Sequence, residues 1–308
     1  MQLLLVTYIS RSGSTLFLNQ LSKYEKFCVC PEADMLVKEF LYYPLKTFKA
    51  SALRKKLANV TANDPKLRAW NITEKEADLI SLKRTGLEIF ITFLQVYRNR
   101  VNPKASTIVF KAVEMANCYS SFESLDENEY SVKHLAILRD PRGIFNSQSI
   151  TKTPLKNKYF NTNPLVTAYL FNHMLRSMTA YEKDNPNSVL TLRFEDFLEN
   201  PKNTILNICT KLGVGFGQIS ENDNSTLFAR LPVEQKQIHK NVIKPIIGAK
   251  VDEWKTDLSK RAIDLISHEI IDTVRLYYPD IEKPRIGLMT KLMLYYYKAR
   301  IFFSIDKY

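Results

Sequence analysis

A short run of hydroxyl-bearing and basic residues near the start of the chain could bind an anion. Residues 10–15 read Ser-Arg-Ser-Gly-Ser-Thr and lie between an apolar run, residues 3–6, and a predicted helix, residues 16–24. A helix that follows a strand directs its free N–H groups and the positive end of its dipole toward the turn. Gly13 lets the backbone approach a bound group closely, and Arg11 supplies a fixed cation. Further donors are the hydroxyls of Ser14 and Thr15 and the backbone N–H groups of Ser12 to Thr15.

The loop differs from the triphosphate-binding pattern G-x-x-x-x-G-K-[ST]. Its first glycine and its lysine are missing, and it is shorter. The difference disfavours a kinase or an NTPase but leaves a phosphate-like ligand. A solvated, serine-rich helix cap without any ligand is the alternative interpretation.

A second segment, residues 138–147, repeats the same arrangement. Arg139 closes a predicted strand, and Pro141 suits the first position of a helix. Ser147 lies about two helical turns after Arg139, so both could contact one ligand. A guanidinium can bind a phosphate through two parallel N–H bonds while a hydroxyl donates a further one. Two such strand ends indicate a ligand with two separated anionic groups, although an exposed Arg-Asp turn is the alternative.

Five short apolar or β-branched segments, separated by helical patterns, predict a parallel sheet flanked by helices. Ligands of such sheets bind beyond the carboxyl ends of the strands, where both basic loops lie. Glu32 follows the second predicted strand, and Lys111 and Glu114 follow the third. We expect one α/β domain over residues 1–308. The predicted strands are residues 3–8, 27–30, 107–110, 134–138 and 189–192.

Two further segments are expected to be helical. Residues 36–101 form a helical insertion between the second and third strands, which we expect to cap the site. Within it, Thr73 and the acidic residues after it resemble a helix N-cap. Residues 287–308 combine basic and aromatic residues, which predicts a C-terminal helix. This helix either packs on the core or lies on an anionic membrane surface.

The overall composition is that of a soluble globular protein that prefers anionic partners. Of the 308 residues, 45% are hydrophobic and 25% are charged, and the net charge is +12. No nucleic-acid-binding motif is present, so we expect no nucleic-acid partner. The N-terminal apolar run is too short for a signal peptide, and the four cysteines are scattered. We therefore expect a cytoplasmic protein with reduced thiols, peripheral at the inner membrane surface if the tail binds there.

Several motifs together resemble PAPS-dependent sulfotransferases, and in particular their carbohydrate-type and bacterial branch. Residues 11–15 resemble the loop that holds the 5′-phosphosulfate, and residues 139–147 resemble the 3′-phosphate motif. Residues 193–201 are similar to the family's R-Y-E-D-L…N-P segment, and residues 254–255 to its late G-x-W-[KR] element. The motifs span most of the chain in the family's order. The resemblance implies a P-loop, nucleotide-kinase-like fold.

The resemblance also implies a reaction and its participants. The sulfuryl group of PAPS would be transferred to a hydroxyl or amine of a glycan or glycolipid, PAP would be released, and no metal would be needed. In-line attack needs donors around the sulfonate and a base near the acceptor. Arg11 and the N–H groups of its loop would serve as donors, and Lys111 as a second cation.

The base is assigned on position alone. In the carbohydrate branch it is often a glutamate after the second strand, which Glu32 matches, and Glu114 is the second candidate. His134 is expected to point away from the site, and His173, which lies on a predicted helix, is interpreted as structural. The alternative functions are a P-loop kinase-like enzyme and a non-catalytic binder of anionic polymers or membranes.

Overall fold

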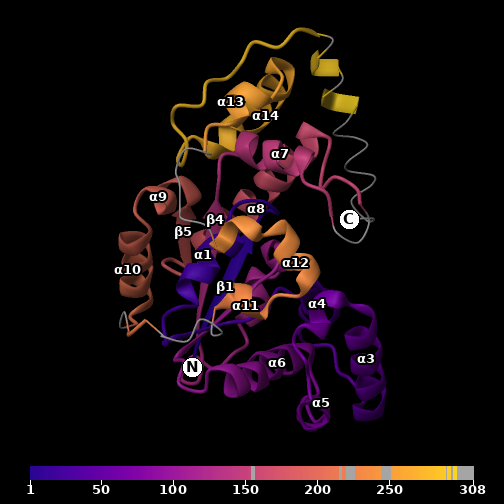
Figure 1. Cartoon of the computed structure of the whole chain (residues 1–308). Coiled ribbons are helices and arrows are strands. Elements are labelled where there is room, and N and C mark those ends of the chain that lie inside the picture. Colours follow the sequence, from indigo (N-terminus) through magenta and orange to yellow (C-terminus); the bar gives the residue numbers. More distant parts are fainter. Residues whose placement is uncertain are drawn as a thin grey trace.

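The predicted strands are all confirmed, and they form one parallel sheet in the order β2-β3-β1-β4-β5. Figure 1 shows β1, β4 and β5 in the middle of the molecule with helices around them. The computed structural model describes residues 1–153, 157–214, 217–219, 226–243, 251–288, 290–292 and 294–296. Residues 3–6 of the central strand are fully buried, as expected where helices cover both faces of a sheet. The strands are β1 (Gln2–Tyr8), β2 (Phe27–Val29), β3 (Thr107–Lys111), β4 (Ser131–Leu138) and β5 (Val189–Arg193).

Alternate residues of the central strand pack into different helical layers. Leu3 and Leu5 join a core with α6 (Gly86–Val101), whereas Leu4 and Val6 join one with α1 and α10. Ala136, Leu138 and Val189, on β4 and β5, pack against α8 (Pro164–Asp184) and α14 (Lys260–Val274). The other helices described are α1 (Ser14–Leu21), α2 (Asp34–Leu36), α3 (Ala50–Asn63), α4 (Pro65–Arg68), α5 (Glu74–Ser81), α7 (Pro141–Ile150), α8 (Pro164–Asp184), α9 (Phe194–Glu199), α10 (Pro201–Leu212), α11 (Leu227–Arg230), α12 (Val233–Ile238), α13 (Trp254–Asp257) and α14 (Lys260–Val274), with the π-helix η1 (Val37–Leu41) and the 3₁₀-helices η2 (Val113–Asn117), η3 (Tyr119–Phe122) and η5 (Lys240–Ile243).

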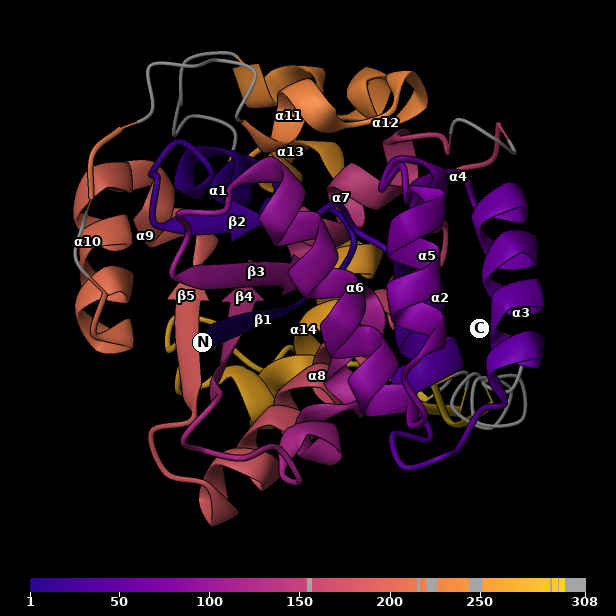
Figure 2. The same cartoon turned by 90° about the horizontal axis from the view of Figure 1, so that it is seen from below.

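The insertion between β2 and β3 is helical, as predicted, and includes α3, α4, α5 and α6 (Figure 2). Thr73 begins α5 with a complete capping box, because its hydroxyl accepts from the Glu76 N–H and the Glu76 carboxylate accepts in return. Trp70 anchors the insertion to the sheet, since its fully buried ring lies against those of Phe93 and Phe110. The insertion is thus part of the main core.

The remaining expectations concern single features. All four cysteines are buried and free of disulfides. Within the described ranges, none of the helices has the length and hydrophobicity needed to cross a bilayer, and no cluster of His, Cys, Asp or Glu suits a metal ion. Of the predicted tail, residues 289, 293 and 297–308 lie outside the described residues. The choice between a docked and a membrane-bound tail stays a prediction.

Candidate active site

A cavity of about 1100 Å³ opens where the sheet ends. Each strand contributes one residue to its wall, either its last residue or one that follows it closely. These residues are Tyr8, Glu32, Lys111, Arg139 and Phe194. The carboxyl ends of the parallel strands therefore meet at one cavity, as predicted for this type of sheet.

The first basic loop is a tight turn between β1 and α1. Arg11 and Gly13 both adopt left-handed backbone conformations, with φ values of 78° and 86°, on either side of the fully buried Ser12. The Ser12 N–H donates to the Ile9 carbonyl at 3.0 Å, which closes the turn. Left-handed backbone is costly for arginine, so contacts around the loop must hold Arg11 in place. The loop therefore directs the start of α1, at Ser14, into the cavity.

Replacing Gly13 with alanine is expected to destabilise the folded protein by about 2–4 kcal/mol. An added Cβ would stand only 2.1 Å from Cε2 of the Phe194 ring, in a backbone conformation that already disfavours a side chain. Gly213→Ala is the matched control, because its φ is also positive at 68° but nothing lies within 4 Å of the added Cβ. Urea unfolding measures both, and equal losses would contradict the predicted clash.

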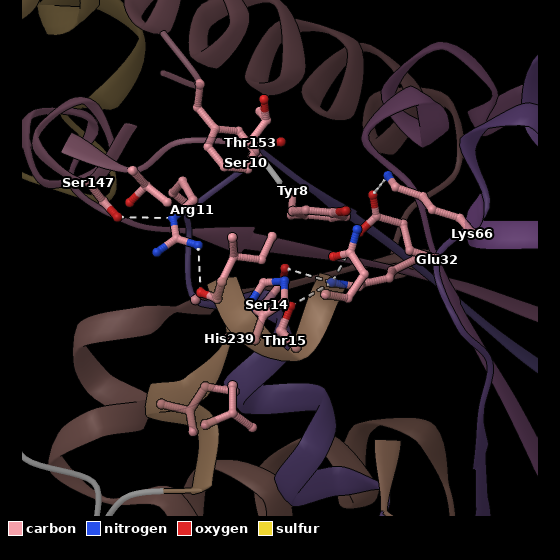
Figure 3. A pocket seen from close by; sticks show the side chains of 18 of the residues that line it. Tyr8, Ser10, Arg11, Ser14, Thr15, Glu32, Lys66, Ser147, Thr153 and His239 are labelled. Carbon is pink, nitrogen blue, oxygen red and sulfur yellow. Dashed lines mark hydrogen bonds and ion pairs between the residues drawn. The ribbon is translucent and has the colours of Figure 1, made fainter. Parts of the chain in front are cut away.

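The two basic loops meet directly. Arg11 Nε donates to Ser147 Oγ at 3.1 Å (Figure 3). Arg139 Nη1 donates to the Arg11 carbonyl at 3.0 Å. Burial lowers the pKa of Arg11 to about 10, with a further contribution from the charge of Arg139, and burial also lowers the pKa of Arg139. Two buried guanidinium groups that repel each other would be stabilised by an anion between them. Arg139 Nε is moreover buried without a hydrogen-bond partner in the described structure.

The segment after Arg139 extends this part of the cavity toward an aromatic ring. Asp140 caps α7 by accepting from the Arg142 N–H at 2.8 Å, with Pro141 at the first helical position. The Asp140 carboxylate also holds the Arg142 guanidinium, whose Cζ lies 3.8 Å from the centre of the Trp254 ring. Glu195 accepts from the Asp140 N–H at 2.9 Å. The motifs that are separate in the sequence therefore adjoin one another at the cavity.

A second charged group lies on the other side of the loop, at the end of β3. Lys111 is 3% exposed, and its Nζ lies 2.8 Å from Thr15 Oγ1, 3.5 Å from Ser14 Oγ and 3.3 Å from Glu32 Oε2. Burial lowers the pKa of Lys111, and the charge of Glu32 opposes that effect. Burial alone would raise the pKa of Glu32, but Lys66 and Lys111 outweigh it and lower that pKa strongly. Glu32 is therefore a carboxylate held between two ammonium groups.

The structure separates Glu114 from the other predicted site residues. Glu114 does not line the cavity; its carboxylate contacts Lys38 Nζ at 3.0 Å and Asn117 Nδ2 at 3.2 Å. The 3₁₀-helix η2 turns it away from Lys111, although the two lie only three positions apart. The buried Ser12 also stands behind the cavity wall, whereas Arg11, Gly13, Ser14, Thr15, Glu32, Lys111, Arg139 and Ser147 all line it.

Two cavity residues were not expected from the sequence. Lys66, at the start of α4, extends from the insertion to Glu32 and Asp34. His239, directly after α12, lines the cavity near Arg11 and Lys111. Burial lowers the pKa of His239 to about 3, with help from these two cations, so its imidazole is neutral at physiological pH. The Asp-Pro turn before Lys66 marks a helix start, but nothing in the sequence shows the direction of its side chain.

Comparison with known proteins identifies the family. The model described as "Sulfotransferase family" matches residues 4–218. The fold is similar to the sulfotransferase domain from the curacin biosynthetic pathway, at 17% identity over 88% of this chain and 96% of that chain, with a TM-score of 0.52. It is also similar to the sulfotransferase domain from the Synechococcus PCC 7002 olefin synthase, at 16% identity over 86% and 93%, with a TM-score of 0.53. No curated protein sequence matches. Because the family match covers most of the chain, this protein belongs to the sulfotransferase family and is a transferase of the P-loop-like α/β fold.

Proposed function

We propose that this enzyme transfers the sulfuryl group of PAPS to a hydroxyl or amine of a glycan or glycolipid and releases PAP. One observation carries the proposal: the Arg11 and Arg139 loops are joined by hydrogen bonds at one cavity wall. A nucleotide that bears two separated anionic groups fits this wall. Among the described residues, neither Arg139 Nε nor Trp254 Nε1 has a hydrogen-bond partner, and both are donors that such a ligand could satisfy.

The geometry supports different roles for the pair Arg11 and Arg139 and for the pair Lys111 and Glu32. Arg11, Arg139 and Ser147 would bind the 3′-phosphate end. Lys111 and the start of α1, with Ser14 and Thr15, would stabilise charge that develops on the sulfonate and the departing phosphate. PAPS supplies the sulfuryl group, and Glu32 would take the proton from the acceptor hydroxyl. We thus propose that the cationic residue beside the sulfonate is Lys111. Arg11 is not assigned this role, because its guanidinium faces Ser147.

The proposed acceptor is supported by the arm of the cavity that the insertion lines. Asn59, Asn63 and Asp64 present amide and carboxylate groups there, which suit the hydroxyls of a sugar. Met35 and Val60 add an apolar wall, which suits an amphipathic molecule. This placement also supports the interpretation of residues 36–101 as a cap over the site.

A peripheral membrane contact of residues 287–308 remains part of the proposal. Leu288, Leu292 and Tyr295 are 73%, 55% and 72% exposed, and their spacing places them on one face of a helix. An enzyme held at the cytoplasmic side of the inner membrane would meet a glycolipid acceptor there. Co-sedimentation with vesicles that contain an anionic lipid tests this contact.

The test of the proposed function combines binding and turnover. Calorimetry with PAP measures donor binding, and transfer of radiolabelled sulfate from PAPS to a panel of octyl glycosides measures activity. Folded protein that does not bind PAP would refute the proposal. Stabilisation by ATP and Mg²⁺ instead of PAP would favour the kinase-like alternative, and salt-sensitive polymer binding without PAP binding would favour the non-catalytic binder.

Replacing Glu32 with glutamine is expected to lower the transfer rate by about 10²–10³-fold, the usual contribution of a general base. His239→Gln is the matched comparison, since its neutral imidazole lines the same cavity, and we expect a loss of at most about tenfold. Because the two lysines lower the pKa of Glu32, the wild-type rate should stay flat down to its ordinary value of 4.5 and fall only below it. A larger loss in His239→Gln, with PAP affinity retained, would assign the base to His239.

A further inference from the structure

The inserted helices reach the candidate base through one side chain. Lys66 Nζ contacts Glu32 Oε1 and lies 2.7 Å from Asp34 Oδ2, so one ammonium bridges two carboxylates that follow β2 (Figure 3). Its side chain is 30% exposed and lines the cavity, whereas Lys111 on the far side of Glu32 is almost fully buried. Lys66 therefore contacts the base from the side on which the insertion lies.

Both ends of this bridge are fixed by other contacts. Asp34 Oδ1 accepts from the Val113 N–H at 3.1 Å, and Glu32 Oε2 lies 3.3 Å from Lys111 Nζ. At the other end, Asp64 caps α4 by accepting from the Lys66 and Leu67 N–H groups at 2.7 and 3.1 Å. The fully buried Leu67 anchors the same turn in the core. The cap and the buried Leu67 thus fix the backbone from which the Lys66 side chain extends to Glu32.

We propose that Lys66 is a positioning residue that holds the Glu32 carboxylate in one orientation and couples the inserted helices to the reaction centre. The proposal rests on the role of Glu32 given above. With Lys66 on Oε1 and Lys111 on Oε2, neither carboxylate oxygen can turn freely. Movement of the insertion would displace Lys66 and so change both the orientation and the proton affinity of the base.

The electrostatic consequence follows from the groups that face Glu32. These are Lys66 from α4, Lys111 from β3, Asp34 at the start of α2, Tyr8 from β1 and His239 after α12. Without Lys66, burial and the nearby Asp34 carboxylate would both oppose a second negative charge, and only Lys111 and the hydrogen bond from Tyr8, among the described residues, would favour it. The pKa of Glu32 would then rise, and the base would be lost at a higher pH than in the wild type.

The test compares Lys66→Met with two controls. Lys66→Arg keeps the charge, and Arg68→Gln removes an exposed cation from the same short helix. Carboxyl ¹³C NMR of Glu-labelled protein follows the titration of Glu32, which is assigned from the signal lost in Glu32→Gln. In Lys66→Met the midpoint should rise by about 1–3 pH units, while in the two controls it stays within about half a unit of wild type.

Activity provides the second readout. With octyl glycosides as acceptors, the acid limb of the rate profile should move upward in Lys66→Met with the NMR midpoint, while PAP affinity stays within about threefold. If Lys66→Met does not fold, Lys66→Gln carries the same expectation. An unchanged Glu32 midpoint in a folded variant would overturn the proposal. Absence of PAP binding by the wild type would instead refute the proposed function, because the NMR titration needs no donor.

Discussion

Replacing Lys111 with methionine is expected to lower the rate of sulfuryl transfer by about a thousandfold while changing PAP affinity by less than about tenfold. Lys111 Nζ lies between Thr15 Oγ1 at 2.8 Å and Glu32 Oε2 at 3.3 Å, in a corner that water hardly reaches. A fixed cation in such a place stabilises developing negative charge far better than a solvated one. Transfer of radiolabelled sulfate and calorimetry with PAP give the two quantities.

The control for this variant is Lys133→Met on strand β4 of the same sheet. Lys133 lies in the N-terminal half of that strand, and its ammonium donates to the Asn187 carbonyl, away from the cavity. It removes the same charge without touching the site, so its rate should stay within about twofold of wild type. Equal losses in both variants, or a loss of PAP affinity as large as the loss of rate in Lys111→Met, would contradict the proposed role.

The sheet was predictable because its signals are local. A continuous apolar run such as residues 3–6 predicts a strand that is buried on both faces of a sheet. The structure confirms this prediction, since residues 3–6 are fully buried. The helix after the first loop was also predicted, but it spans Ser14–Leu21 rather than residues 16–24. The turn is tighter than the sequence suggested, since Arg11 as well as Gly13 adopts a left-handed conformation. That conformation depends on contacts with distant residues.

From the sequence, only the site residues at the ends of strands could be placed at the cavity. Lys111 and Arg139 extend strands, so the topology of a parallel sheet places them at the cavity. Lys66 and His239 belong to short helical segments whose position is set by tertiary packing, and no local pattern shows their orientation. Glu114 was the second candidate base because it follows the third strand, but the 3₁₀-helix η2 directs its carboxylate to Lys38 and away from the cavity.

Tertiary packing separates the basic residues of the site into two groups, which their positions in the sequence did not indicate. From the sequence, Arg11 was expected beside the sulfonate, because its loop resembles the phosphosulfate loop. In the structure its guanidinium contacts Ser147 Oγ and the Ile238 carbonyl, so it lies with Arg139. Lys111 lies instead beside the hydroxyls of Ser14 and Thr15. We therefore expect substitutions in the two groups to differ in kind, one affecting donor affinity and the other affecting turnover.

Replacing Arg139 with alanine is expected to weaken PAP binding by about a hundredfold or more, the usual loss when a buried charge pair loses one partner. Its guanidinium is buried over the Phe194 ring, 5.4 Å from the ring centre, and its Nε has no hydrogen-bond partner among the described residues. Calorimetry with PAP measures the loss. Arg176→Ala removes an exposed arginine from α8 and should leave the affinity unchanged.

A second ligand separates two ways in which Arg139 could act. Adenosine 5′-phosphosulfate lacks the 3′-phosphate. If Arg139 binds that phosphate, Arg139→Ala should hardly change the affinity of the protein for adenosine 5′-phosphosulfate. If Arg139 acts only by supporting the Arg11 carbonyl, to which it donates at 3.0 Å, both ligands should lose affinity equally. If Arg139 contacts the 3′-phosphate directly, the losses of binding free energy from removing the arginine and from removing the phosphate should not be additive. Equal weakening of both ligands would show that Arg139 shapes the loop and that another group binds the 3′-phosphate.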